Sequence, residues 1–554
     1  MKNIFSRYRC QLTFTFISVV YIFFRWITFK GFSGEDDLQY AMLARNLLHG
    51  RYNPFVVSDL FSGRAILVAY QSIVYRIGGV NIYSTLSGSL FVTILCCYLV
   101  VFRLVRHIHV GGVIVTSALF YFNPVLNSSV LTPDIEVMLV GLIIFLIWRE
   151  NPNEKGPVRI FSKSILIGFL ACAAMSFKET ALIFIPFLLA AAFICRRNND
   201  LKVALVASFA FLIFIVLAGC VYYYATGDFF FRVKQIENAI YIYSRSCAIA
   251  GKHPLFARLT YTVWANFIAT SYYPVIFVSI MILLRILFDK SYRVKKDSIV
   301  SYFIILTILS LYFPFSLRGY QPLCFKSRHF LFLLPLAVGI NASFVFDAWK
   351  DKRVLSLCIV TSAFLLTTCV LITGEKWYWM IYGLLFMYFA LQRLVLPNSL
   401  FYHLRYVTFA GILLLYMFYQ LFFLNSDWFK NMQTISTTVN GKYFYFPEHD
   451  NMMNWKLLHG FDDSIHCHNL GKDAYNGYAS YYEKVDSLNF HPGWFIVNKS
   501  YARRPVVLSS VDSLNRLNYF SRTIFDGDLA AFFIDDSVQL ATLRKIINAD
   551  PSNR

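Results

Sequence analysis

One stretch decides the fold class: residues 203–225 read VALVASFAFLIFIVLAGCVYYYA and contain no charged residue. A helix of that length spans the ~30 Å hydrocarbon layer of a membrane. Similar runs recur to about residue 424, and the 554 residues are 57% hydrophobic and only 15% charged. Water-soluble globular proteins carry about 25% charged residues, so a soluble enzyme is excluded. We interpret the chain as an α-helical polytopic membrane protein.

The apolar runs between charged clusters predict about thirteen transmembrane helices. The runs cover, approximately, residues 12–30, 80–101, 110–127, 131–148, 164–177, 179–195, 202–225, 264–288, 299–316, 329–348, 354–373, 377–395 and 406–424. Together they predict a membrane domain, residues 1–424, with long outer loops at 31–79 and 226–263.

The orientation follows from the basic residues, because Lys and Arg in short loops are retained on the cytoplasmic side. They cluster in alternate loops: Lys2, Arg7 and Arg9; Arg103 and Arg106; Arg149, Lys155, Arg159 and Lys163; Arg196, Arg197 and Lys202; Lys290, Arg293, Lys295 and Lys296; Lys350, Lys352 and Arg353; Arg393 and Arg405. The N-terminus is therefore predicted in the cytoplasm and the tail, residues 425–554, outside. The first span has no small-residue cleavage site, so we interpret it as retained. A bacterial inner membrane, with a periplasmic tail, is the favoured location, and the endoplasmic reticulum is the alternative.

The formal net charge of +20 does not indicate a nucleic-acid partner. No basic stripe with interleaved aromatic residues occurs in a polar segment, and much of the positive charge belongs to the predicted cytoplasmic loops. The eleven cysteines include no CxxC pair, so the sequence predicts no zinc or redox motif.

The tail changes character abruptly at about residue 425. Strand-like stretches alternate with turn-prone Asn, Asp, Gly and Pro, and a helical pattern follows at Val538–Ile547. The predicted strands are Tyr443–Phe446, Trp494–Val497, Pro505–Leu508 and Ala530–Ile534. The tail is therefore predicted to be a small α/β extracytoplasmic domain.

The first outer loop begins with three carboxylates, Glu35, Asp36 and Asp37. Ser33 and Asp36 have the spacing of a capping box, and neither Gly nor Pro interrupts the chain until Gly50, so a helix of about four turns is predicted. The carboxylates either stabilise the N-terminus of this helix through its dipole or supply a general base for an acceptor hydroxyl.

Further charges lie at other predicted outer ends of the spans. Thr132-Pro133-Asp134-Ile135-Glu136 lies where two spans meet, Lys178-Glu179 occupies an almost loopless turn, and Arg328-His329 opens a later span. Adjacent residues do not face one another on a helix, so Lys178 and Glu179 should not form a salt bridge with each other. A turn Asp at 134 and an Arg328 that only reaches the membrane surface are the alternatives. Collected at one membrane face, carboxylates and cations can accept a hydroxyl proton and hold a phosphate.

These residues resemble the GT-C glycosyltransferases, in particular the branch of protein O-mannosyltransferases and lipid A aminoarabinose transferases that use polyprenyl-phosphate sugars. Asp36-Asp37, with Tyr40-Ala41, Arg45 and Gly50, resembles the family pattern Asp-Glu-x-x-Tyr-Ala. Supporting matches are Gly78-Gly79-Val80-Asn81, Pro133-Asp134, Lys178-Glu179 and Arg328 before Leu334-Pro335. The family's Lys-x-Pro has its nearest counterpart in Phe61-Ser62-Gly63-Arg64, which lacks the Pro.

The resemblance implies a thirteen-span GT-C bundle and an inverting transfer of sugar on the outer membrane face. Asp36 corresponds to the family's catalytic carboxylate and Asp134 to its second acidic position. The substrate-binding residues implied are Asp37, Tyr40, Arg45, Arg64, Lys178, Glu179, Arg328 and His329. The partners implied are a polyprenyl-phosphate-linked sugar donor and a lipid, glycan or protein acceptor. No metal or other cofactor is required, although Asp36, Asp37 and Asp134 could together bind a divalent cation.

Two other functions stay open from the sequence. A transporter or lipid-sugar flippase tends to carry its ionisable residues at the membrane midplane and often has an internal repeat, whereas here the charges lie at predicted outer ends and no repeat is visible. A catalytically inactive protein that binds a sugar lipid is the third alternative.

Overall fold

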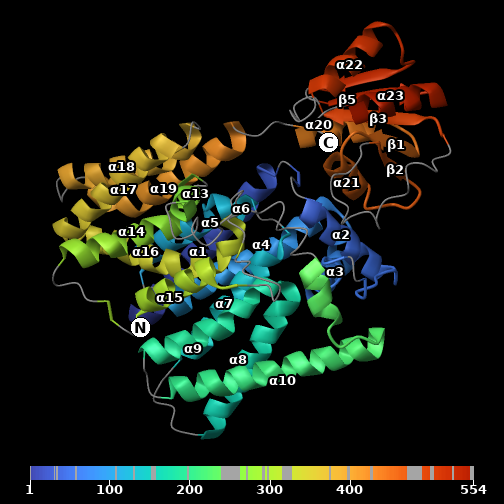
Figure 1. The fold of residues 1–554 in the computed structure, drawn as a ribbon. Coiled ribbons are helices and arrows are strands. Elements are labelled where there is room, and N and C mark those ends of the chain that lie inside the picture. Colours follow the sequence, from blue (N-terminus) through green and yellow to red (C-terminus); the bar gives the residue numbers. More distant parts are fainter. Residues whose placement is uncertain are drawn as a thin grey trace. The chain divides into compact units, whose positions relative to one another are not determined.

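The computed structural model is mostly helical, with one small sheet near the C-terminus (Figure 1). It describes residues 2–29, 31–32, 35–56, 59–106, 109–128, 131–150, 157–195, 199–238, 262–269, 272–289, 294–295, 298–314, 323, 327–372, 376–395, 400–423, 428–470, 490–498, 505–526 and 529–549. The chain divides into two compact units. Unit 1 comprises Met1–Arg25, Arg64–Ile66 and Ser89–Gln420, and unit 2 comprises Trp26–Gly63, Leu67–Gly88 and Leu421–Arg554.

Most of the described residues of each predicted transmembrane run are helical. The helices concerned are α1 (Lys2–Ile27), α4 (Ile82–Leu99), α5 (Val110–Tyr121), α7 (Pro133–Arg149), α8 (Pro157–Phe177), α9 (Phe184–Cys195), α10 (Asp200–Thr226), α14 (Tyr273–Phe288), α15 (Ile299–Tyr312), α16 (Leu334–Ala348), α17 (Lys352–Ile372), α18 (Lys376–Leu394) and α19 (Leu400–Phe423). Among the described residues, six helical segments are long and apolar enough to cross a membrane, and further apolar helices are shorter. The prediction of a polytopic α-helical membrane protein is therefore confirmed.

Two predicted spans are interrupted, and a proline explains each break. Residues 110–127 form α5 and a short helix α6 (Pro124–Ser128), and residues 264–288 form α13 (Thr262–Ala269) and α14. Pro124 and Pro274 each lie at the start of the second helix, because proline lacks the N–H that a helix interior needs but fits the first turn. The prediction of a single continuous helix across each of these runs is wrong.

Helix α10 shows the two-sided pattern expected of a helix between protein and lipid. Its small residues Ala204 and Ala207 are buried, whereas Phe209, Leu212 and Val216 are exposed. On α8, Gly168 lies so close that a Cβ there would approach the Ala207 carbonyl oxygen to 2.6 Å. Small residues thus let α8 and α10 pack closely, as is common between membrane helices, while the large side chains form an apolar outer surface.

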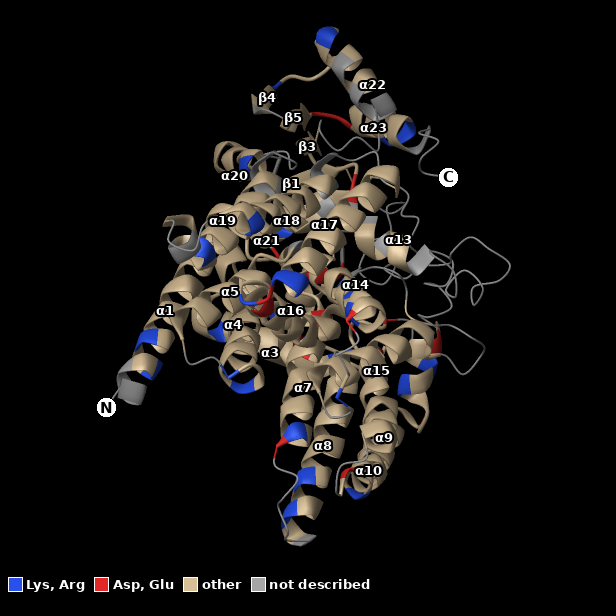
Figure 2. Cartoon of the chain, turned by 90° about the vertical axis from the view of Figure 1, so that its left-hand side faces the viewer, with Lys and Arg blue, Asp and Glu red and all other residues tan. Residues whose placement is uncertain are grey.

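Helices α7 and α8 form another pair, and their basic residues lie at one end of it (Figure 2). Arg149 ends α7, and near the start of α8 Lys163 Nζ donates a 2.6 Å hydrogen bond to the Glu150 carbonyl oxygen. Asp134 lies in the first turn of α7, about 22 Å along the helix from Arg149. The acidic end of α7 is therefore the end opposite the cluster predicted to be cytoplasmic.

Unit 2 contains the predicted α/β domain. Its five strands, in the order β2-β1-β3-β5-β4, are β1 (Tyr443–Phe446), β2 (His466–Asn469), β3 (Gly493–Asn498), β4 (Thr523–Asp526) and β5 (Leu529–Ile534). β1 pairs in parallel with β2 and β3, and β5 pairs antiparallel with β3 and β4. The helices are α20 (Trp428–Thr438), α21 (His449–Leu458), α22 (Pro505–Arg516) and α23 (Ser537–Ala549). Phe495, Phe532 and Leu543 are central to its core.

The strand predicted at Pro505–Leu508 is wrong, because these residues begin α22. A four-residue apolar run does not distinguish a strand from a helix by its periodicity. Val511 is buried and Leu514 packs against the same core three residues later, which is helical spacing. The other three predicted strands and the C-terminal helix are confirmed.

Candidate functional site

A buried ion pair joins two helix ends in unit 1. Lys178 Nζ lies 2.6 Å from Asp134 Oδ1, and the two side chains are only 7% and 4% exposed. Pro133 starts α7 and places Asp134 in its first turn, while α8 ends at Phe177 and leaves Lys178 in extended conformation. The two residues are thus brought together from segments that are far apart in the sequence.

Arg64 and Glu179 form another ion pair of the same unit, next to the first in sequence at Lys178-Glu179. Arg64 Nη2 donates to both carboxylate oxygens of Glu179, at 3.1 and 3.0 Å, and the side chains are 6% and 16% exposed. Glu179 begins the short 3-10 helix η2 (Glu179–Ile183), directly after Lys178. As predicted, the adjacent residues Lys178 and Glu179 do not pair with each other, because each finds its counter-ion on another segment.

Two more cations act on these pairs. Arg328, in η3 (Ser327–Leu333), acts on Lys178 as a like charge, and Arg232 stabilises the Glu179 carboxylate electrostatically. Four cations, Arg64, Lys178, Arg232 and Arg328, therefore share one neighbourhood with the two paired carboxylates. We call these six residues the cation cluster.

Arg232 was not among the residues predicted from the sequence. It lies in the helical stretch 231–238, after Gly227 ends α10 with a positive φ of 74°. Its guanidinium also donates to Gln235 Oε1. The available signal was its position in a predicted outer loop, where arginine is less expected than in cytoplasmic loops.

Glu136 and His329 lie beside the cluster in sequence but contribute differently. Glu136 is buried two residues after Asp134 and acts electrostatically on Cys96 of α4. On a helix two residues are about 200° apart, so these two carboxylates face different neighbours. His329 lies in η3 next to Arg328 and is half-buried.

Two buried threonine hydroxyls flank the charged residues. Thr132 precedes Pro133-Asp134, and Thr180 follows Lys178-Glu179. Both residues are buried, and among the described residues neither Oγ1 has a hydrogen-bond partner. Thr132 is the N-cap residue of α7, yet its side chain makes no cap hydrogen bond. These hydroxyls are therefore available to a ligand.

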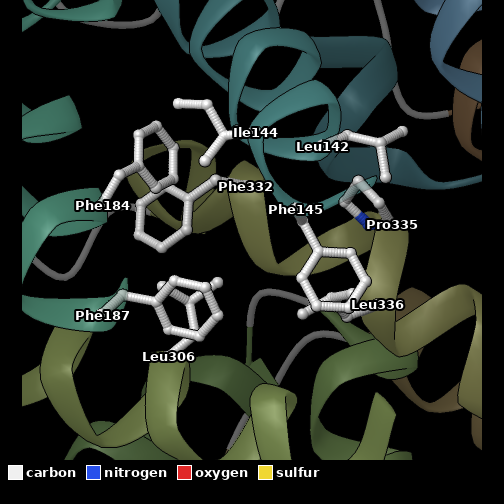
Figure 3. A pocket seen from close by; sticks show the side chains of 10 residues that line it. Leu142, Ile144, Phe145, Phe184, Phe187, Leu306, Phe332, Pro335 and Leu336 are labelled. Atoms are coloured by element: carbon white, nitrogen blue, oxygen red, sulfur yellow. The ribbon is translucent and has the colours of Figure 1, made fainter. Parts of the chain in front are cut away.

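An apolar cavity is lined by residues of α7 and η3, two of the elements that carry the cluster, and by residues of α9 and other helices (Figure 3). Its lining includes Leu142 and Phe145 of α7, Phe184 of α9, and Phe332 of η3. Leu142 lies eight residues beyond Asp134, which is about 12 Å along α7. Along α7, the charged residue Asp134 is thus followed by residues that line an aromatic, apolar cavity.

Asp36 lies in unit 2, on the predicted helix. That helix is α2 (Glu35–Leu48), whose fourteen residues confirm the expected length, while Ser33 lies outside the described residues. Asp36 is half-buried, whereas Asp37 and Tyr40 are buried. Tyr40 packs edge to face on Phe61 at 5.3 Å. Asp36 therefore keeps access to solvent, whereas the neighbouring Asp37 is packed inside.

Arg45 binds another part of unit 2. Arg45 Nη1 lies 3.0 Å from Asp463 Oδ1, and Arg51 Nη1 lies 2.8 Å from Asp463 Oδ2. The hydrogen bond from Arg45, with a further one from Arg51, holds the pKa of the Asp463 carboxyl below its ordinary value. Arg45, predicted to contact substrate, has a protein partner in this structure.

The described residues contain no group of three or more His, Cys, Asp or Glu side chains arranged to hold a metal ion. Asp134, one of the three carboxylates considered for a divalent cation, instead has the Lys178 ammonium at its Oδ1.

Sequence comparisons find neither a matching family model nor a matching curated protein. Solved structures do match. ArnT from Cupriavidus metallidurans bound to undecaprenyl phosphate is 12% identical, with a TM-score of 0.56 over 95% of this chain and 98% of that chain. The same protein in the apo state gives 12% identity and a TM-score of 0.53 over 94% and 97%. The Archaeoglobus fulgidus oligosaccharyltransferase in the apo form is 13% identical, with a TM-score of 0.44 over 89% and 70%. The chain therefore has an ArnT-like fold, and the predicted fold is confirmed.

Proposed function

We propose that this protein is a membrane glycosyltransferase that moves a sugar from a polyprenyl-phosphate donor to an acceptor hydroxyl on the outer face of the membrane. The acceptor is a lipid, glycan or protein. The ArnT-like fold supports the class, and ArnT itself has been crystallised with undecaprenyl phosphate. A bacterial inner membrane with a periplasmic C-terminal domain is the proposed setting.

The gathering of four cations in the cation cluster is the observation that carries this proposal. Arg64, Lys178, Arg232 and Arg328 come from different segments and act on the same neighbourhood around Lys178 and Glu179. A polyprenyl phosphate released by sugar transfer carries up to two negative charges, which such a cluster of cations attracts. Arginine and lysine bind phosphate oxygens through strong charge-assisted hydrogen bonds.

The apolar cavity lies on α7 and η3, the elements that also bear Asp134 and Arg328. It has room for about one water molecule, so it marks apolar surroundings on these elements and is not itself a channel for an isoprenoid chain.

In the proposed reaction, the Asp36 carboxylate accepts the proton of the acceptor hydroxyl. The hydroxyl oxygen forms a bond to the anomeric carbon while the bond from that carbon to the phosphate oxygen breaks. The bonding electrons leave with polyprenyl phosphate, whose charge the cation cluster stabilises. Attack opposite the leaving group inverts the anomeric configuration.

The cations can stabilise the leaving phosphate without a metal ion, and a divalent cation bound by carboxylates is the alternative. Transfer that continues after chelation of divalent metals would support the first arrangement. Loss of transfer that is restored by Mg²⁺ or Mn²⁺ would support the second.

The test is transfer by the purified full chain in detergent or lipid nanodiscs. Polyprenyl-phosphate sugars are supplied with membrane extracts as acceptors, and release of free polyprenyl phosphate is measured together with sugar on the acceptor. The proposal predicts that both products appear in equal amounts. Movement of intact sugar lipid across vesicles without bond cleavage would contradict it and indicate a flippase.

A further inference from the structure

The side chain of Asn454 makes two hydrogen bonds to the backbone of a single residue, Phe32. Its Oδ1 accepts from Phe32 N at 3.1 Å, and its Nδ2 donates to Phe32 O at 2.9 Å. Both residues are buried, with Asn454 fully inaccessible. A side-chain amide can satisfy a backbone donor and acceptor together in this way, as a neighbouring strand would. Asn454 thus fixes the backbone at Phe32, three residues before the start of α2.

Three further contacts join residues 29–51 to the C-terminal part of unit 2. Phe29 packs edge to face against Phe429 of α20 at 5.4 Å. At the far end of α2, Arg45 and Arg51 bind Asp463, in the turn after α21. Helices α2 and α21 lie side by side (Figure 1). The helix that carries Asp36 is therefore held at both ends by the C-terminal region.

The contacts differ in strength. The ion pairs to Asp463 are exposed to water, since that carboxylate is 56% exposed, and exposed pairs are weak. The Asn454 pair is dry, and removing the amide would leave a buried N–H and a buried C=O without it. Asp36 follows Phe32 by only four residues, so the two lie close together along the chain.

We propose that Asn454 is a positioning residue for Asp36, and that the C-terminal α/β domain serves the transfer reaction by fixing the position and direction of α2 within unit 2. The inference rests on the proposed function, in which Asp36 is the general base. A general base must lie within hydrogen-bond reach of the hydroxyl, and a misplacement of about 1 Å can lower the rate on the order of 100-fold.

The experiment compares Asn454→Ala with Asn451→Ala in the full chain. Asn451 is a matched control on the same helix: it is also buried, but its amide donates to Glu448, a local partner. Turnover and the donor KM are measured on folded protein, and amide hydrogen exchange is followed in α2 and in α16. We expect turnover of Asn454→Ala to fall by about 10- to 100-fold with an almost unchanged donor KM, and exchange to rise in α2 but not in α16.

Equal turnover of the two variants would overturn the proposal, whatever the exchange data show. Unchanged exchange in α2 would overturn it as well, because the hydrogen bonds would then not control the helix. Asn454→Asp supplies a second test, since an ionised carboxylate still accepts from Phe32 N but cannot donate to Phe32 O, and it should also lose turnover. If the wild-type protein transfers no sugar, the proposed function fails, and the exchange data alone then decide whether Asn454 holds α2.

Discussion

Lys178 and Asp134 form a 2.6 Å ion pair in which each side chain is more than nine-tenths buried. Removing one partner leaves the other charge buried and uncompensated, which typically costs about 3 to 5 kcal/mol. We therefore expect Lys178→Met to lower the thermal stability of the detergent-solubilised protein strongly. Adding Asp134→Asn should restore most of that loss. The measurement is thermal unfolding followed by tryptophan fluorescence, and an Asp134→Asn change that gives no recovery in the Lys178→Met background would contradict the pairing.

Arg328 tests the phosphate role of the cation cluster without breaking the ion pair. Arg328→Ala should weaken use of the lipid-phosphate donor by about 1.5 to 3 kcal/mol, the range of a hydrogen bond to a charged group. Arg149→Ala, at the opposite end of α7, is the control. The donor KM and the binding of polyprenyl phosphate are measured, and equal donor dependence in the two variants would remove Arg328 from the site.

Replacing Thr132 or Thr180 by Val should raise the stability of the protein but weaken its binding of the donor. A buried hydroxyl without a partner is destabilising by about 1 kcal/mol or more, so replacement by the similarly shaped Val should raise the unfolding temperature of the ligand-free protein. The same change should weaken donor binding, because a ligand oxygen would lose its hydrogen-bond partner.

Thr361→Val is the control for these variants. Thr361 is also buried in the bundle, but its Oγ1 contacts the Met281 sulfur at 3.1 Å. Its replacement should neither stabilise the protein nor change donor binding. Stabilisation of the Thr132 and Thr180 variants with unchanged donor binding would assign these hydroxyls no role in the site.

Removing the ion pairs of Asp463 should change the stability only slightly, and by the same amount at every pH near neutrality. The carboxylate is 56% exposed, so Asp463→Asn should change stability by less than about 1 kcal/mol. The pKa of Asp463 is lowered in the fold, so its contribution is present above the ordinary Asp pKa of about 3.9 and is lost only as the pH falls through the lowered value. Unfolding temperatures of both proteins at pH 6 and pH 8 should therefore differ by the same amount, and a difference that changes between these pH values would contradict the assignment.

The sequence alone predicts those parts of the fold that depend on local pattern. The apolar run 202–225 becomes α10 within two residues at either end, and the residues after Gly34 form the four-turn helix α2. Pro505–Leu508 fails because four apolar residues satisfy either periodicity. Local pattern therefore predicts long elements well and short ones poorly.

The contacts that build the site depend on distant segments and could not be predicted. Lys178 and Asp134 were both candidate residues, but nothing in the sequence indicates that they pair across 44 positions. Asn454 and Phe32 are 422 positions apart, and neither residue type is unusual in its local sequence. Which side chains meet is determined by helix packing, so a sequence motif supplies candidates and the fold supplies their partners.

The membrane orientation is tested by reporter fusions. The alternation of basic clusters predicts a cytoplasmic reporter after Lys296 and after Lys352, and an outer reporter after Asn425. A cytoplasmic reporter after Asn425 would place the C-terminal domain on the wrong side of the membrane for the proposed reaction.

Asp36→Asn tests the central claim most directly. The amide keeps the size of the carboxylate but cannot accept the acceptor proton, so the turnover of folded protein should fall by at least ~100-fold. The corresponding Glu35→Gln and Asp37→Asn variants should keep measurably more activity. The Asp37 side chain points about 100° away from that of Asp36 around the helix, so it cannot replace the Asp36 carboxylate. Transfer from a polyprenyl-phosphate sugar is measured for all three variants at equal amounts of folded protein. A turnover at least ~100-fold below wild type for Asp36→Asn alone is the predicted result, and wild-type turnover of this variant would contradict the mechanism.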